Sequence, residues 1–551
     1  MADSIESFKL VCSGGLNSNE NHLDLSDNKS GAATRLVNFE PSLYGGYRRL
    51  EGYNHYGDIN ATVGGSATEG KVLGLAIYDN SHIGNPYVIA ARKVAGSNTY
   101  KFYKFVALSG WQEITSAPAR SMTIGSRSVD KLRHVQFDWG SGSTICFVDG
   151  VNPAVIFDGA NWYELLQANT GGTSSPGGDQ LVDAPSIVGE YQKHLWVGGD
   201  KVSRATLRHS AANDPYTWTN GAGGGLVNPA FNVVQIKPFR DNLFIFGSNG
   251  IKKIVTSRTN ASPPATVFTE ENVTNNVGCI ARDSVVEIAG DLLFLAPDGF
   301  RPVSSTSKIG DVELETVSKP IQVSLVNLIK NNDMDTLNSV VIRGKSQVRF
   351  FVGDDTTDQI DSTGIIGGLY DQDGSIAWSF GELTGIRASV TESGYMGTEE
   401  LVLHGDYDGK VYQQEKGNNF AGNNIIAVYS TPYLDFGDTE VRKTIRKVNT
   451  FVRAEGPTEF YLNVDYDWGD YNTSRPSEYL ESSDGGPVVY NGLNLDYGDA
   501  NVLYGGNSKP ILTSDIQGSG FSTRATFVTI GQSEPYSIQG IVFEFSVSGR
   551  R

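Results

Sequence analysis

The stretch SVVEIAGDLLFLAPDGFRPVS, residues 284–304, holds three short β-rich runs separated by two tight turns. The turns are Gly290-Asp291 and Asp298-Gly299, residue types that tolerate the positive φ of two-residue hairpin turns. The middle run, residues 292–296, is wholly apolar, as expected of a strand buried on both faces. The stretch therefore predicts three strands of an antiparallel meander.

The same pattern returns along the chain at intervals of 49 to 56 residues. Taking the second turn as the anchor, the copies lie at Gly96, Gly150, Asp200, Gly250, Gly299, Asp355 and Gly409. A β-meander repeated at this period is typical of propeller blades. We expect seven blades, or six if one meander belongs to another domain. A tryptophan often follows in the expected fourth strand, where it would pack between blades, as at Trp111, Trp162, Trp218 and Trp378.

Composition and texture divide the chain into three parts. At 551 residues it is too long for one ordinary core, and 64 glycines with 25 tyrosines and 25 phenylalanines suit an all-β protein. We predict an extended N-terminal arm over residues 1–70, a β-propeller over 71–424, and a C-terminal β-sandwich-like region over 425–551. The last region is predicted from longer strand-like runs after Asn424.

The N-terminal arm contains a polar, turn-rich stretch, residues 14–53. It has too few apolar residues for a core of its own, so it must run along another surface. We expect it to pack across a subunit boundary or against the C-terminal sheet. Its anchors, and the candidate subunit-interface residues, are Arg35, Tyr47, Arg48 and Arg49, because guanidinium groups bind carboxylates and aromatic faces.

Charge and cysteine usage bound the function. The net charge is −18, with 44 basic and 62 acidic residues, which argues against a general DNA-binding surface. A like-charged wall would instead let DNA pass without holding it. The three cysteines show neither a disulfide framework nor zinc spacing, and we expect buried thiols of a protein made in a reducing cytoplasm. No long apolar run or signal-peptide core is evident, so we expect no membrane anchoring of its own.

Acidic turns are the first candidates for chemistry. Asp371-Gln372-Asp373-Gly374 and Asp406-Tyr407-Asp408-Gly409 resemble the opening of a calcium loop but lack its later acidic ligand. Hairpin turns explain them better. Asp465, Asp467 and Asp470 form a denser acidic patch, in which strand alternation would place Asp465 and Asp467 on one solvated face. We therefore predict no metal site and no cofactor.

No catalytic set is evident either. The run SAANDPYTWT, residues 210–219, resembles the Asp-box of sialidase propellers, which is a fold element and not an active site. The seven histidines show no paired-ligand spacing, and no phosphate loop, dinucleotide fingerprint or nucleophile elbow occurs. We predict that the protein is not an enzyme.

Four terminal motifs carry a family resemblance: GGLNSN (14–19), NFEPSLYGGYRRLEGY (38–53), TPYLDFG (431–437) and VRKTIRKVN (441–449). With the order arm, propeller and C-terminal β region, the chain resembles the tail nozzle proteins of short-tailed bacteriophages. That family is also called tail tubular protein B, tail hub or packaged-DNA-stabilising protein.

The resemblance implies a structural protein of the virion tail, made in the host cytoplasm and forming a hexameric ring. Its partners would be other copies of itself, the tail adaptor protein above, tail fibre or tail needle proteins, and viral DNA that passes through the channel without sequence-specific binding. The ring would retain packaged DNA and conduct it during ejection.

Two alternatives stay open. One is a glycan-binding or glycan-cleaving propeller that acts in host receptor recognition. The other is a periplasmic or surface scaffold, which the missing signal-peptide core disfavours. Ring assembly predicts large subunit interfaces without turnover, whereas a glycan reader predicts saturable binding of sugar by the monomer.

Overall fold

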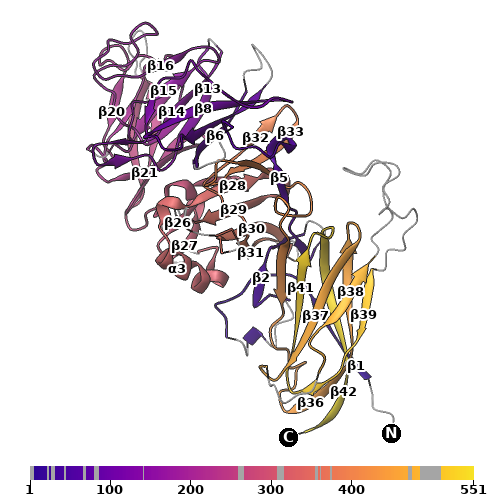
Figure 1. The fold of residues 1–551 in the computed structure, drawn as a ribbon. Coiled ribbons are helices and arrows are strands. Elements are labelled where there is room, and N and C mark those ends of the chain that lie inside the picture. Colours follow the sequence, from indigo (N-terminus) through magenta and orange to yellow (C-terminus); the bar gives the residue numbers. More distant parts are fainter. Residues whose placement is uncertain are drawn as a thin grey trace.

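The computed structural model describes residues 5–21, 24–25, 31–42, 45–65, 70–79, 86–140, 142–200, 202–258, 266–306, 316–353, 356, 358–359, 361–372, 375–469, 475–483 and 510–550. The molecule is all-β and elongated, with a propeller at one end and a two-sheet sandwich at the other (Figure 1). The predicted fold class is confirmed.

The propeller consists of antiparallel meanders that follow one another along the chain. Among the described residues, six units have a four-stranded meander, to the first of which the short β10 adds a fifth strand, and one unit has three strands. The first three are β6 (Val72–Tyr78), β7 (Tyr87–Lys93), β8 (Thr99–Val106) and β9 (Gly110–Glu113); β13 (Arg133–Asp138), β14 (Ser143–Val148), β15 (Val155–Phe157) and β16 (Trp162–Glu164); and β17 (Ile187–Tyr191), β18 (His194–Gly198), β19 (Leu207–His209) and β20 (Gly225–Val227). The next two are β21 (Val233–Phe239), β22 (Asn242–Gly247), β23 (Ile251–Arg258) and β24 (Thr266–Thr274), and the three-stranded β25 (Val286–Ile288), β26 (Asp291–Ala296) and β27 (Gly299–Pro302). The last two are β28 (Asn338–Ile342), β29 (Gln347–Val352), β30 (Thr363–Gln372) and β31 (Ser375–Thr384), and β32 (Val390–Met396), β33 (Glu399–Gly405), β34 (Val411–Gln414) and β5 (Tyr53–His55).

The period read from the sequence matches these units. Six of the seven anchor residues lie at the passage from a second to a third strand, and Asp355 lies outside the described residues. Six complete four-stranded blades are the number given as the fallback. The remaining meander, the fifth along the chain at residues 284–304, is the three-stranded unit, and it is followed by α2 (Val303–Thr306) and α3 (Gln322–Asn331).

The last blade takes its fourth strand from the other end of the chain. Strand β5 pairs antiparallel with β34, so that Tyr53 lies opposite Gln414 and His55 opposite Tyr412. The arm therefore closes the ring of blades, because β32 of this blade packs against β6 of the first.

Three of the four tryptophans, Trp111, Trp162 and Trp378, lie in fourth strands as predicted, and Trp162 packs between blades. Trp162 of β16 lies 4.7 Å, between ring centroids, from Phe102 of the preceding blade and 4.5 Å from Phe157 of its own. The strand position was wrong for Trp218, which lies between β19 and β20, but its ring does pack in the core shared by two blades, with Ile156 and Val197. Its indole N–H donates to the Pro215 carbonyl, and the ring is fully buried.

The C-terminal region forms a sandwich, in which strands of the arm take part. One sheet runs β3 (Phe39–Pro41), β4 (Tyr47–Arg49), β42 (Tyr536–Arg550), β36 (Val441–Ala454) and β39 (Ile511–Asp515), with β1 (Ile5–Val11) on β42 and β40 (Ser519–Gly520) on β36. The opposite sheet contains β35 (Ile425–Ser430), β41 (Thr523–Gly531), β37 (Thr458–Tyr466) and β38 (Tyr479–Ser483). Alternating burial along β37 and β41 shows that each strand turns one face to the core.

One short strand joins the two halves of the molecule. Strand β2 (Arg35–Val37) pairs parallel with β31 of a propeller blade and antiparallel with β35 of the sandwich. A continuous nine-stranded sheet results, in the order β28-β29-β30-β31-β2-β35-β41-β37-β38. One apolar core follows it, from Phe300 and Phe350 in the propeller to Phe460 and Ile541 in the sandwich.

The shorter elements complete the description. They are β10 (Arg120–Ser121), β11 (Thr123–Ile124), β12 (Arg127–Ser128) and the 3-10 helices η1 (Tyr56–Asp58), η2 (Arg282–Ser284), η3 (Lys319–Ile321), η4 (Met334–Thr336) and η5 (Arg343–Lys345). The predicted buried thiols are confirmed for Cys12, Cys146 and Cys279. Within the described residues, no helix is both long and apolar enough to span a membrane.

Closure of the last blade can be tested at Tyr53. The ring is 3% exposed and stacks on Phe420 at 4.9 Å, so Tyr53→Ala leaves a cavity at the joint between arm and propeller. We expect a loss of about 3–5 kcal/mol in the free energy of unfolding, measured by urea denaturation. Tyr395→Ala, at a side chain that is 51% exposed, is the control and should change it by less than about 1 kcal/mol. Equal effects of the two variants would contradict a closing role for β5.

Candidate functional site

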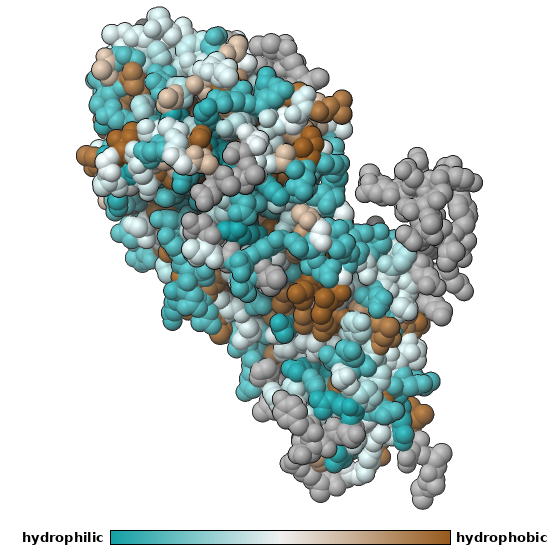
Figure 2. Space-filling view, in the orientation of Figure 1, coloured by the Kyte–Doolittle hydropathy of each residue, from teal (hydrophilic) through white to brown (hydrophobic). Residues whose placement is uncertain are grey.

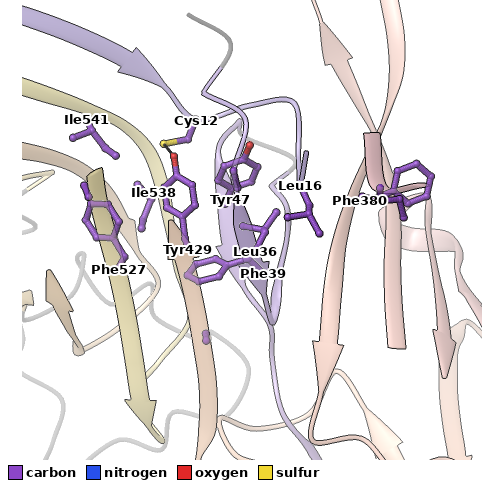
Figure 3. Packing of buried hydrophobic residues seen from close by; sticks show 14 of the residues in the cluster. Cys12, Leu16, Leu36, Phe39, Tyr47, Phe380, Tyr429, Phe527, Ile538 and Ile541 are labelled. Carbon is purple, nitrogen blue, oxygen red and sulfur yellow. Dashed lines mark hydrogen bonds between the residues drawn. The ribbon is translucent and has the colours of Figure 1, made fainter. Parts of the chain in front are cut away.

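The arm is held first by Tyr47, which lies in the shared core (Figure 3). Its hydroxyl donates to the Ser13 carbonyl at 2.6 Å and accepts the Gly15 N–H at 3.0 Å. Its ring meets Tyr429 edge-on at 5.0 Å, and burial holds the pKa of Tyr47 well above its usual value. Tyr47 therefore fastens two loops of the arm onto the sandwich.

Arg49 is fully buried two residues further on. Its guanidinium donates to three backbone carbonyls, those of Ser533 (2.8 Å), Asn418 (3.2 Å) and Gly531 (3.2 Å). Burial lowers its pKa, but an arginine keeps its charge at any physiological pH. Its contacts thus tie the arm both to the chain that follows the last blade and to the sandwich.

Between these residues, Arg48 joins a buried ion network. It pairs with Glu40 (2.8 Å), Glu51 (2.5 Å) and Glu455 (2.5 Å), so it links the arm to the turn between β36 and β37. Its own side chain is 12% exposed, whereas that of Glu40 is 1% exposed. The network therefore extends from Arg48, near the surface of the molecule, to Glu40 in its interior.

The inner half of the network is contributed by the propeller. Glu40 accepts from Lys345 (2.8 Å), from Gln347 (3.0 Å) and from Arg349 (3.2 Å), and Arg349 is also 1% exposed. Arg349 and Lys345 both pair in addition with Glu415, at the end of the last blade. Arm, two blades and sandwich thus share one set of charges.

The network keeps Glu40 ionised. Burial alone would raise the pKa of its carboxyl, but the cations of Lys345, Arg349 and Arg48 outweigh burial and hold that pKa well below its usual range. Because the folded-state pKa is depressed, the network stabilises the fold above the ordinary glutamate pKa. This contribution is lost as the pH falls toward the folded-state value.

The structure brings three of the four predicted anchor residues together. Tyr47, Arg48 and Arg49 follow one another on β4 and make their described contacts within the chain. Of the two partners left open for the arm, the C-terminal sheet is the one observed. Arg35 lies apart on β2 with an exposed side chain.

Sequence reasoning missed Glu40 and its propeller partners. A signal was available in β29, QVRFFV, where Gln347 and Arg349 interrupt an otherwise apolar strand whose six residues are all buried. A buried arginine needs an anionic partner, but the sequence did not say that the partner is Glu40, more than 300 residues away.

A second candidate site lies on the propeller axis, where a cavity of about 560 Å³ is enclosed by the inner strands. Its charged lining residues are Lys131, Arg133, His134, Glu190, Lys237, Asp283, Glu287, Arg343 and Glu392. The volume suits a small ligand and is far too small for duplex DNA.

One side of this cavity is internally paired. Arg133 binds the Asp283 carboxylate with two hydrogen bonds of 2.8 Å, and Lys131 reaches the same group at 3.1 Å. Burial lowers the pKa of Lys131 to about 8, although Asp283 acts in the opposite direction. These contacts fix β13 against η2 across the axis.

The other side holds groups with weaker partners. Burial raises the pKa of Glu392 to about 8, while Lys237 and Arg343 counter this only in part. Burial and the charge of Lys237 lower the pKa of His134 to about 4. The 3.7 Å contact of His134 with Glu392 therefore joins a neutral imidazole to a largely protonated carboxyl at neutral pH. Within the described residues, the Lys237 ammonium makes no hydrogen bond or ion pair and is attracted by the nearby charges of Glu392 and Glu287, so it is available to a ligand.

The acidic turns do not form a metal site among the described residues. The Asp406 carboxylate accepts the backbone N–H groups of Asp408 (2.9 Å) and Lys410 (2.7 Å), which is the turn role expected for it. Asp465 pairs with Arg475 and Arg524, and Asp470 and Asp373-Gly374 lie outside the described residues. In the Asp-box-like run, Asp214 accepts the Tyr216 N–H at 2.9 Å and shapes the turn.

Comparison with known proteins gives little beyond this. No family model matches the sequence, and no curated protein matches it. Part of the chain is similar to two crystal structures of the extracellular domain of BT4673 from B. thetaiotaomicron, described as a one component system and as a hybrid two component system. The identities are 8% and 10% and both TM-scores are 0.33; the matches cover 67% and 79% of this chain but 40% and 44% of those chains. The chain thus spans less than half the length of these structures, and similarity this low carries no argument about function.

The ion network can be tested at Arg349. Arg349→Met leaves Glu40 and Glu415 buried with fewer cations, and we expect a loss of about 3–5 kcal/mol in the free energy of unfolding at pH 7, measured in urea. Arg343→Met removes a guanidinium whose side chain is 47% exposed and should cost less than about 1 kcal/mol. A small effect at Arg349 would show that the network does not hold the joint.

The raised pKa of Glu392 in the axial cavity predicts how the stability of the fold depends on pH. Because its folded-state pKa is raised, the folded state binds one more proton than the unfolded state between about pH 4.5 and 8. Stability attributable to this group should fall across that range, by at most about 1.4 kcal/mol per pH unit. Glu392→Gln should therefore gain stability over the natural protein as the pH rises from 5 to 8 in urea titrations. Glu287→Gln, at an exposed site of the same cavity, is the control, and its free energy of unfolding should depend on pH as that of the natural protein does. If Glu392→Gln shows the same pH dependence as the natural protein, the prediction is wrong.

Proposed function

We propose that this chain is a structural ring protein of a bacteriophage tail, of the nozzle or hub type. Its copies would surround an axial channel that retains packaged DNA and conducts it during ejection. The observation that carries the proposal is where the four family-like motifs lie. The first three, within residues 14–437, meet at the joint between propeller and sandwich, whereas the fourth, residues 441–449, lies further along the sandwich.

Three of the motifs contribute contacts of the joint. Leu16 of GGLNSN donates its backbone N–H to Phe380, and Tyr47 and Arg49 belong to the second motif. Thr431 of TPYLDFG accepts a hydrogen bond from Thr34 at 3.1 Å. The motif VRKTIRKVN begins β36 and pairs with residues 542–550 of β42, whereas β4 pairs with Ser537 and Ile538 of the same strand. Three of the motifs that resemble the family of ring proteins thus lie where the arm joins the propeller to the sandwich, which supports the proposal.

The path of DNA follows from the size of the axial cavity. Since about 560 Å³ holds only a small molecule, the channel must form between subunits, with propellers in its wall. The net charge of −18 favours a wall that does not bind phosphate.

A second candidate function, a glycan-reading propeller, is favoured by one observation. The open ammonium of Lys237 beside Glu392 could hold a carboxylated sugar in the axial cavity. Incubation with sialosides and host surface polysaccharide separates the two: saturable binding that Lys237→Met abolishes would support the glycan reader.

The ring proposal predicts assembly without retention of DNA. By mass photometry and electron microscopy, we expect purified protein to form closed rings, hexameric as the family resemblance implies. On filters at 50 mM salt, the rings should retain no linear duplex DNA, because each phosphate contact would need a fixed basic residue. A monomer at micromolar concentration, or DNA binding with a steep salt slope, would contradict the proposal.

A further inference from the structure

The outer face of the sandwich sheet formed by β35, β41, β37 and β38, here called face C, carries apolar side chains. Val528 lies opposite Tyr461, which lies opposite Leu480, and Ile426 pairs with Ile530. Ile426, Leu480 and Ile530 are 41%, 59% and 58% exposed. In Figure 2, brown surface gathers over this part of the sandwich. Face C therefore exposes to solvent a row of apolar side chains that spans at least three strands.

The opposite outer face, formed by β1, β42, β36 and β39 and here called face A, carries a second row. Val11 lies opposite Gly540, Gly540 opposite Phe451, and Phe451 opposite Ile511. Val11 and Ile511 are 48% and 44% exposed, and Phe451 is half-exposed. The inward neighbours Leu10, Val452 and Leu512 are buried, so the row is directed away from the core.

The charges of the two faces differ in sign. Outward basic residues of face A, namely Lys9, Arg442, Arg446 and Lys447, outnumber its acidic Glu544 and Asp515, even though Lys447 is paired with Asp515 at 3.8 Å. On face C, the basic Arg475 and Arg524 are already paired with Asp465, while Glu459 and Glu478 add acidic charge. A basic excess on face A is unexpected in a chain of net charge −18 and complements face C.

We propose that face C of one copy docks on face A of the next copy. Two different patches on opposite sides of one sandwich make a heterologous contact, and such a contact generates a closed ring when its rotation closes. The apolar rows would meet at the centre of the interface, with the basic and acidic residues at its rim. This inference rests on the proposed function and adds which surfaces form the ring.

Charge placed in either row tests the contact. Ile530→Asp breaks face C and leaves face A intact, and Ile511→Asp does the reverse; Leu480→Asp and Val11→Asp are second variants of each kind. Each variant alone should be monomeric by mass photometry under conditions where the natural protein forms rings. Leu226→Asp, on the propeller at a side chain that is 51% exposed, is the control and should still form rings. Circular dichroism melting confirms that each variant is folded.

Mixing the variants gives the sharper result. A face C variant mixed with a face A variant retains one intact contact per pair, so a dimer should appear that neither variant forms alone. If the mixture stays monomeric, or if both single variants still form rings, the assignment of faces is wrong while the ring function stands. If the natural protein itself forms no ring, the proposed function fails, and the faces then serve another partner or none.

Discussion

A single buried carboxylate constrains how the two halves of this molecule meet. Glu40 is 1% exposed and stays charged only because cations approach it from the propeller, through Lys345 and Arg349, and from the arm, through Arg48. Removing any side of this cage leaves an uncompensated charge in the interior, which costs far more than a surface ion pair. The arm, the propeller and the sandwich must therefore be in place together.

The strand that precedes Glu40 extends this constraint into a sheet. Strand β2 is only three residues long, yet it gives blade β28–β31 and strand β35 of the sandwich a common ladder of hydrogen bonds. A short strand between two edges also removes the exposed edges that would invite aggregation. The propeller and the sandwich are consequently not two domains on a linker, and a force applied to one is transmitted through a continuous sheet to the other.

The repeats of the propeller could be predicted from sequence because each blade is local: its turns need Gly or Asx, and its second strand is apolar, as at residues 292–296. The longer strands after Asn424 were predictable because they too are local runs, and β35, β36, β37, β41 and β42 lie in the region predicted for them. The contacts of Glu40, β2 and the axial cavity were not predictable, because they join residues hundreds of positions apart. Residues 131–136 carry no motif, and only closure of the ring brings them opposite Lys237 and Glu392. The placement of Trp218 in a fourth strand was wrong because its spacing matched that of the other tryptophans, whereas Trp218 lies in a turn and donates its indole N–H to the Pro215 carbonyl.

The position of the arm at the start of the chain has a consequence for synthesis. Cys12 meets Tyr429, 417 residues later, and Tyr53 completes a blade with Gln414. At about 5–20 residues per second, the ribosome needs roughly 20–80 s to deliver such partners. During this interval the arm has no sheet to pair with. Because the segment is polar and rich in glycine, it can stay solvated without aggregating. The composition that keeps the arm from folding alone is thus what lets it serve as the last piece to be inserted.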